Sequence, residues 1–129
     1  MKILNSKLHG YLDFVVVLAF ALAPTLLGFT NQIAMLCYAL AGVHLALTLF
    51  TNFPFGFASK IIPMKIHGWV ELAVAPTLVA IPRVLGFFGG EATASAFFTI
   101  AGVVVFGVWL CTDYKNARKS SSSTIRRAA

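Results

Sequence analysis

Four long apolar stretches dominate this sequence and restrict the folds open to it. Each is about 20 residues long, and short segments rich in Gly, Pro, Asn or Thr separate them. A helix of roughly 20 apolar residues crosses a bilayer, and only helices or closed barrels satisfy their backbone groups in lipid. None of the stretches shows the period-two alternation of a barrel strand. The sequence therefore predicts four membrane spans, at about 8–28, 32–51, 66–85 and 92–112.

The composition agrees with a membrane protein. Of the 129 residues, 59% are hydrophobic and 11% are charged, whereas soluble domains have roughly 45–50% and about 25%. A soluble globule, a disordered chain and a disulfide scaffold are therefore excluded. We expect one transmembrane domain over 1–114, followed by a basic, disordered, cytoplasmic tail over 115–129. Cys37 and Cys111 fall in opposite leaflets, so we expect two buried thiols and no disulfide.

The basic residues predict the orientation of the spans. Nine of the ten Lys and Arg residues fall on one side of the four spans, and only Arg83 lies near the other side. The positive-inside rule makes the basic side cytoplasmic. We therefore expect a multi-pass protein of the bacterial inner membrane with both termini in the cytoplasm. The net charge of +6 then reflects topology and contact with the lipid bilayer, and nucleic acid is not an expected partner. Since short spans bury few groups per helix, we also expect a homo-oligomer.

The chain contains an internal repeat. The segment Lys7–Asp13 matches Lys65–Glu71, and the register continues without a gap until 8 of 23 positions are identical. The end of the second span, 49–53, corresponds in the same way to 110–114. Because each repeat holds two spans, both repeats enter the membrane from the same side. We predict an all-α, integral membrane four-helix bundle made of two parallel two-helix repeats, at about 7–53 and 65–114. Recurrence of the first span also excludes its being a signal peptide.

The repeats resemble a known family. Pro24 precedes Leu27–Phe29, and Pro82 precedes Leu85–Phe87, so that Leu-Gly-Phe follows a proline twice. This pattern is similar to the SPW-repeat family of small bacterial integral membrane proteins, which have two spans per repeat. The Ser and Trp that flank the family's proline are absent here, which indicates a divergent member. The resemblance implies the two-span repeat and carries over no functional residue.

Each repeat places a histidine four residues before an acid. His9 precedes Asp13, and His67 precedes Glu71, so each pair shares one helical face. Ionisable groups inside a membrane cost roughly 2.5–3.5 kcal/mol each on insertion scales, so they require a reason. One interpretation is a polar helix start at headgroup level. The other is an inward-facing polar cluster, whose further members would be His44, Thr48, Thr51, Asn52, Thr112 and Asp113.

Three functions are compatible with this cluster. The leading hypothesis is a non-enzymatic structural or partner-binding membrane protein, because no hydrolase, kinase or nucleotide motif is present and no catalytic residue is predicted. The alternative is a proton or ion pathway through the His and carboxylate groups. A further alternative is a haem- or metal-binding electron carrier in which His9 and His67 are ligands. The sequence leaves open whether a metal or another cofactor is bound.

Proline and aromatic residues give further local expectations. Pro24 and Pro82 are expected to end their helices, whereas Pro76 should kink the third span. The aromatic residues near the basic side predict an interfacial belt. That belt comprises Tyr11, Trp69, Trp109 and Tyr114, together with Phe53, Phe55 and Phe57 of the central linker.

Overall fold

Four helices form the fold. The structure is a computed structural model that describes residues 2–53, 61–85 and 91–115. In it α1 spans Ser6–Leu27, α2 Asn31–Phe50, α3 Met64–Val84 and α4 Ala92–Cys111. Every helix end lies within two residues of its predicted position. All four helices are long and apolar enough to cross a membrane, so the chain is a multi-pass membrane protein with four candidate spans.

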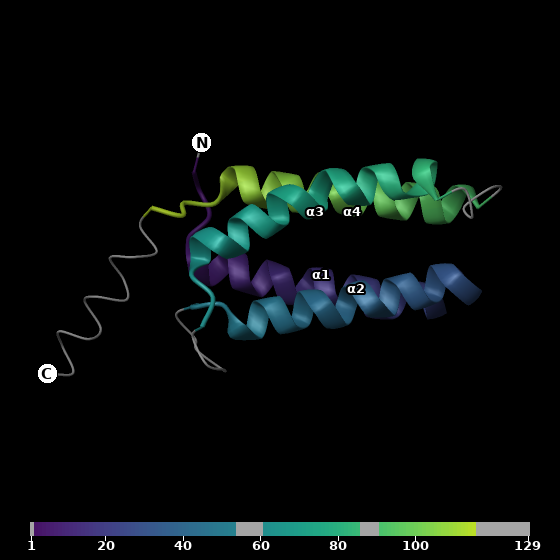
Figure 1. Cartoon of the computed structure of the whole chain (residues 1–129), viewed down its shortest axis with the longest axis horizontal. Coiled ribbons are helices and arrows are strands. Elements are labelled where there is room, and N and C mark those ends of the chain that lie inside the picture. Colours follow the sequence, from purple (N-terminus) through teal and green to yellow (C-terminus); the bar gives the residue numbers. More distant parts are fainter. Residues whose placement is uncertain (1, 54–60, 86–90, 116–129) are drawn as a thin grey trace, which may run out of the picture.

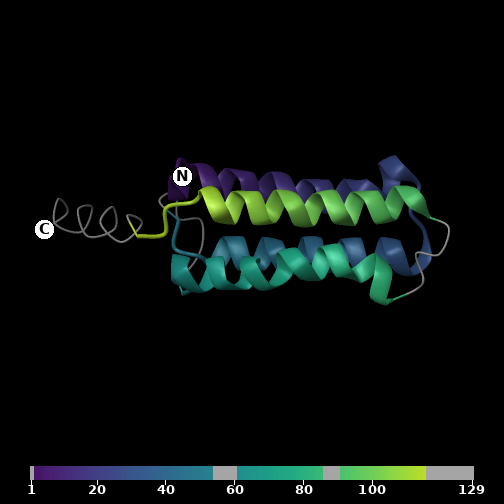
Figure 2. The same cartoon turned by 90° about the horizontal axis from the view of Figure 1, so that it is seen from above.

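The helices form two hairpins. Helix α1 packs along α2, and α3 packs along α4. Figure 1 shows the hairpins as two layers, and Figure 2 shows the same bundle turned by 90°. Helices α1 and α3 both begin at the end of the bundle where α2 and α4 finish (Figure 1). The predicted all-α four-helix architecture is thus confirmed, with the predicted pairing of neighbouring helices.

Local signals fix the ends of α1. The side chain of Asn5 accepts a hydrogen bond from the Leu8 amide at 2.9 Å and so caps the helix start. The helix ends at Gly28, whose φ of 72° lies in the left-handed region that glycine tolerates best. Pro24 and Pro82 lie in the last turn of their helices, as expected, and α1 and α3 end three and two residues beyond them. A proline near a helix end removes only one hydrogen bond, and the helix continues past it.

The bundle is polar inside at one end and apolar inside at the other. Phe20 meets Phe97 and Phe98 edge to face in the apolar half, with ring centroids 5.2 and 5.8 Å apart. The outer surface is apolar as well, with Leu26 74% exposed and Val84 76% exposed. An apolar outer surface of this extent matches a lipid environment and not water.

The polar end is held together by backbone pairing between segments far apart in the sequence. The Leu4 amide donates to the Cys111 carbonyl at 2.9 Å, and the Asp113 amide donates to the Leu4 carbonyl at 3.0 Å. Ile62 lies opposite Thr51 in an equivalent parallel bridge. The segment entering α1 is therefore tied to the end of α4, and the segment entering α3 to the end of α2.

Some of the smaller expectations need correction. Phe53 is 1% exposed, so it packs inside the protein and not at the membrane interface; the pairing at the end of α2 turns it inward. Both cysteines are free, as predicted, but only Cys37 is buried. Phe55, Phe57 and the tail from residue 116 lie outside the described residues.

Candidate metal centre

Two histidines and two acids meet between the hairpins at the polar end. His9 and Asp13 come from α1, and His67 and Glu71 come from α3. The histidines are fully buried and the acids are 2% exposed. The i,i+4 spacing within each repeat points both members of a pair to one face, and the bundle turns that face inward. The structure therefore places these side chains inside the protein and not on its outer surface.

The four side chains converge on one point. The two Nε2 atoms of His9 and His67 lie 3.4 Å apart. The Asp13 carboxylate lies 3.4 Å from His9 Nε2 and 3.1 Å from His67 Nε2. Glu71 Oε1 lies 3.3 Å from His9 Nε2 and 3.7 Å from His67 Nε2. Each acid thus contacts the histidine of the other repeat at least as closely as its own.

Two threonines fix which nitrogen of each ring carries a proton. The Thr112 hydroxyl lies 2.6 Å from the Val108 carbonyl, which can only accept, so the hydroxyl proton lies between them. Thr112 Oγ1 must then accept from His9 Nδ1, 2.7 Å away. In the neutral imidazole the Nε2 of His9 therefore has the lone pair, and it is directed at the centre.

The second repeat has the same arrangement. Thr51 donates to the Leu47 carbonyl at 2.6 Å, and its Oγ1 lies 2.9 Å from His67 Nδ1. In its neutral form His67 likewise has its lone pair on Nε2. Two lone pairs facing each other at 3.4 Å repel, unless a cation or a proton lies between them.

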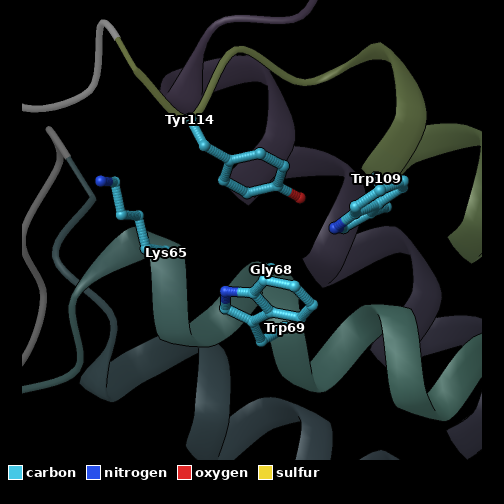
Figure 3. A pocket seen from close by; sticks show the side chains of 5 residues that line it. All are labelled: Lys65, Gly68, Trp69, Trp109 and Tyr114. Atoms are coloured by element: carbon cyan, nitrogen blue, oxygen red, sulfur yellow. The ribbon is translucent and has the colours of Figure 1, made fainter.

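Glu71 is oriented by Tyr114. The Tyr114 hydroxyl donates to Glu71 Oε2 at 3.0 Å, which leaves Oε1 on the side of the histidines. Burial, and then the nearby charge of Glu71, raises the pKa of Tyr114 well above its usual range, so the phenol keeps its proton. The ring lies over Gly68 (Figure 3), where an added Cβ would come within 2.7 Å of it.

His44 of α2 lies beside Asp13. Its Nε2 is buried, has no hydrogen-bond partner among the described residues, and lies 3.7 Å from Asp13 Oδ1. In repeat 2 the corresponding position is Val104, so this neighbour breaks the symmetry of the cluster. If His44 carries a proton on Nε2, that proton faces Asp13 Oδ1, whereas His67 contacts Asp13 Oδ2.

Phe53 and Tyr114 enclose the histidine rings. The Phe53 ring stacks on His9, with centroids 5.9 Å apart, and contacts the edge of His67 at 5.5 Å. Tyr114 contacts His9 from another direction at 5.9 Å. Aromatic walls of this kind exclude water and restrict the rotation of the imidazoles.

The remaining predicted members lie at the margin of the cluster. Asn52 uses its backbone amide to bond to the Ile62 carbonyl at 3.0 Å. The Asp113 carboxylate accepts from the Lys115 amide at 3.0 Å. Thr48 donates to the His44 carbonyl at 2.8 Å and lies 3.5 Å from Asp13. These residues flank the four central groups, which alone form the group able to hold an ion among the described residues.

The spacing of three candidate ligand atoms is close to the spacing around a tetrahedral metal ion. A tetrahedral ion with ligands at about 2.0–2.2 Å separates its ligand atoms by about 3.3–3.6 Å. The distances among His9 Nε2, His67 Nε2 and Glu71 Oε1 run from 3.3 to 3.7 Å. Asp13 turns Oδ1 toward His9 and Oδ2 toward His67, and one atom from each of the four residues lies within 4.8 Å of the others. Imidazole and carboxylate together are ligands for zinc, iron or manganese in the divalent state.

Charge balance in the cluster is satisfied either by a divalent ion or by protons on both histidines. The ion-pair partners of Asp13 and Glu71 in the described part of the chain are all histidines. With both Nε2 atoms unprotonated, the centre has two negative charges in a region of low dielectric constant, which is costly. One divalent cation brings the sum to zero.

Sequence reasoning missed the supporting roles of Phe53 and Tyr114, which it assigned to the membrane interface. The internal repeat contains the pattern that could have identified these roles, because it aligns Thr51–Phe53 with Thr112–Tyr114. Each repeat therefore supplies a threonine whose hydroxyl contacts a histidine Nδ1. An aromatic residue follows that threonine two positions later in the chain.

Comparison with known proteins adds no relative. No protein-family model, no curated protein and no solved structure matches the chain.

Proposed function

We propose that this membrane protein is non-enzymatic and holds one divalent transition-metal ion, for which zinc is the best fit, between its two hairpins. The observation that supports the proposal is the convergence of two imidazoles and two carboxylates, one atom of each lying within 4.8 Å of the others. The threonine contacts support it further, because outer hydrogen bonds that orient imidazole ligands are typical of metal sites.

The number of ligands favours a structural role. Four protein ligands fill the coordination sphere of zinc, whereas catalytic sites keep one position open for water or substrate. Two ligands come from α1 and two from α3. The ion would therefore cross-link the two hairpins, in agreement with the structural role that the sequence favours.

A proton or ion pathway is the weaker candidate. A pathway needs polar groups along the whole span. The buried polar residues of the described part all lie at the end that holds the cluster. Beyond them the interior is apolar, with Phe20, Leu78 and Phe98 at its centre. Proton flux into liposomes, compared between the wild type and the Asp13→Asn/Glu71→Gln variant, tests this alternative.

Haem fits the geometry less well than a bare ion. A haem with two axial histidines needs the porphyrin ring to lie between them. Here the two Nε2 atoms are 3.4 Å apart, and the carboxylates of Asp13 and Glu71 occupy the space beside them. An absorption spectrum of the purified protein checks this directly.

We further propose that the centre lies near the cytoplasmic face of a bacterial inner membrane. The excess of Lys and Arg at the end where α1 and α3 begin supports this orientation. A homo-oligomer and membership of the SPW-repeat family remain part of the proposal. Neither is needed for the ion, because all four ligands come from one chain.

Metal content is the decisive measurement. The full chain would be purified in detergent with an affinity tag that lacks histidine, loaded with zinc, and desalted. We expect one zinc per chain by elemental analysis, and visible bands of tetrahedral intensity after loading with cobalt. The His9→Asn and His67→Asn variants should lose the ion, and Glu71→Gln should bind it more weakly.

His44→Asn is the matched control, because it removes a partly buried histidine beside Asp13 that is not among the four proposed ligands. It should retain one ion per chain. Circular dichroism would confirm that every variant keeps its helices. Wild-type protein without stoichiometric metal, or His67→Asn protein with undiminished metal, would show that the proposal is wrong.

A further inference from the structure

A second site lies at the same end of the bundle, outside the metal centre. A cavity of about 160 Å³ is bounded by α3, α4 and the segment after α4. Figure 3 shows the Tyr114 ring across the cavity, opposite Trp69 and above Gly68. This volume is far larger than one water molecule needs. The lining residues are Lys65, Gly68, Trp69, Trp109 and Tyr114.

The walls are mainly aromatic, with a lysine at the edge. Three of the five lining residues are aromatic, one is a lysine whose ammonium group points away from the rings (Figure 3), and none is acidic. A second lysine, Lys2, places its Nζ 5.8 Å from the centroid of the Tyr114 ring. Such a surface favours a ligand that has both a negative charge and an apolar part.

The position of the cavity points to lipid. Lys65 and Trp69 lie in the first two turns of α3, and Trp69 is 71% exposed on the outer surface of the bundle. At the end of a membrane span this is the level of the headgroups, where Trp and Tyr rings and lysines gather. A free anion in water would gain little from indole walls, whereas a phospholipid can use both the walls and the lysine.

We propose that this cavity binds the headgroup of an anionic phospholipid. The phosphate pairs with Lys65, and the glycerol and upper acyl chain lie against Trp69 and Trp109. The floor is provided by Gly68, whose missing side chain allows the Tyr114 ring to lie over α3. This proposal stands without the metal ion, because none of the five lining residues is one of its proposed ligands.

The internal repeat supplies a natural control. Lys7 and Tyr11 occupy the positions in repeat 1 that correspond to Lys65 and Trp69. Trp109 corresponds to Thr48, so the first repeat lacks both indoles. Lys7 has the same charge at the same end of the bundle. Substituting it therefore tests whether general electrostatic attraction is sufficient to explain a preference for anionic lipid.

Tryptophan fluorescence reports on this cavity alone. The chain has only two tryptophans, and both line the cavity. The full protein would be reconstituted into phosphatidylcholine vesicles that contain equal shares of brominated phosphatidylcholine or brominated phosphatidylglycerol. Bromine on the acyl chains quenches a nearby indole. We expect stronger quenching by brominated phosphatidylglycerol in the wild type.

The variants decide between a built site and a general effect. Lys65→Gln should reduce the preference for phosphatidylglycerol by about fivefold, which is the usual contribution of one lysine at an anionic surface. Lys7→Gln should leave the preference unchanged. Equal quenching by both lipids in the wild type, or equal losses in the two variants, overturns the proposal. So does loss of the preference when inorganic phosphate is added, because the site would then be one for free phosphate. Circular dichroism serves as the check that each variant keeps its helices.

Discussion

At the scale of single residues, the proposed centre depends on hydroxyl groups that are not themselves ligands. Thr51 and Thr112 each accept from a histidine Nδ1 and donate to a carbonyl four residues earlier. Replacing either by valine keeps the volume but removes the acceptor, so the imidazole loses its orientation and its fixed proton. We expect Thr51→Val and Thr112→Val each to weaken zinc binding about 10–100-fold.

Competition with a chromogenic chelator measures this affinity. Thr77→Val is the control, because the Thr77 hydroxyl also bonds to its own helix, at the Ala73 carbonyl, but lies on the exposed surface. It should bind zinc like the wild type. Unchanged affinity in both Thr51→Val and Thr112→Val would mean that the threonines do not support the ligands.

Gly68 makes a second residue-scale prediction possible. In Gly68→Ala the new Cβ would lie 2.7 Å from Tyr114 Cε1, so the ring must move and its hydroxyl withdraws from Glu71. We expect a loss of about 1–3 kcal/mol in the free energy of unfolding, together with weaker zinc binding. Tyr114→Phe should weaken zinc binding without the steric cost. Gly42→Ala, with no atom within 4 Å of the new Cβ, should change neither quantity.

Part of the site could be predicted from the sequence. The i,i+4 spacing of His9 with Asp13 and of His67 with Glu71 placed each pair on one face. Whether the two faces meet depends on how the hairpins pack, and no local pattern contains that information. The role of Tyr114 was hidden for a similar reason, since a tyrosine just beyond a span is equally typical of a membrane interface.

At the scale of helices, one close approach decides the geometry of the second hairpin. In Gly102→Ala the new Cβ would lie 2.7 Å from the Ala75 carbonyl oxygen on α3 and 2.7 Å from Val79 Cγ2. Backbone cannot move aside as a side chain can, so α3 and α4 must separate. We expect a destabilisation of about 1–3 kcal/mol, measured by unfolding in mixed detergent.

Gly107→Ala on the same helix is the matched control, since nothing lies within 4 Å of its new Cβ. If Gly102→Ala and Gly107→Ala unfold at the same detergent composition, then Gly102 does not set the distance between α3 and α4. Small residues at such crossings are the usual means of close helix contact in membranes, where lipid removes the hydrophobic driving force.

The helices themselves were the most predictable part of the fold. Length and hydropathy fix a membrane span, because the thickness of the bilayer sets how many apolar residues are needed. The ends were less certain, as Pro24 and Pro82 illustrate. A proline marks where a helix is weakened, but the tertiary contacts beyond it decide whether the helix stops.

At the scale of the whole molecule, the repeat explains why the polar groups lie where they do. Each half contributes one histidine, one acid and one threonine, and the backbone pairing at the polar end joins each half to the other. Thr112 of repeat 2 supports His9 of repeat 1, and Thr51 of repeat 1 supports His67 of repeat 2. The centre can therefore form only when both hairpins are in place.

This dependence predicts that metal and folding are coupled. An ion that binds only the folded chain stabilises it by RT ln(1 + [L]/Kd), which is about 2.7 kcal/mol at a hundred times Kd. We expect the thermal midpoint in detergent to rise with the logarithm of free zinc, and to fall when a chelator is added. His67→Asn should unfold at one temperature whatever the zinc concentration, because it lacks a ligand. His44→Asn should retain the zinc dependence of the wild type. If the thermal midpoint of the wild type also does not change with zinc concentration, the four groups stabilise the bundle by their own hydrogen bonds. The ion then has no part in joining α1 to α3.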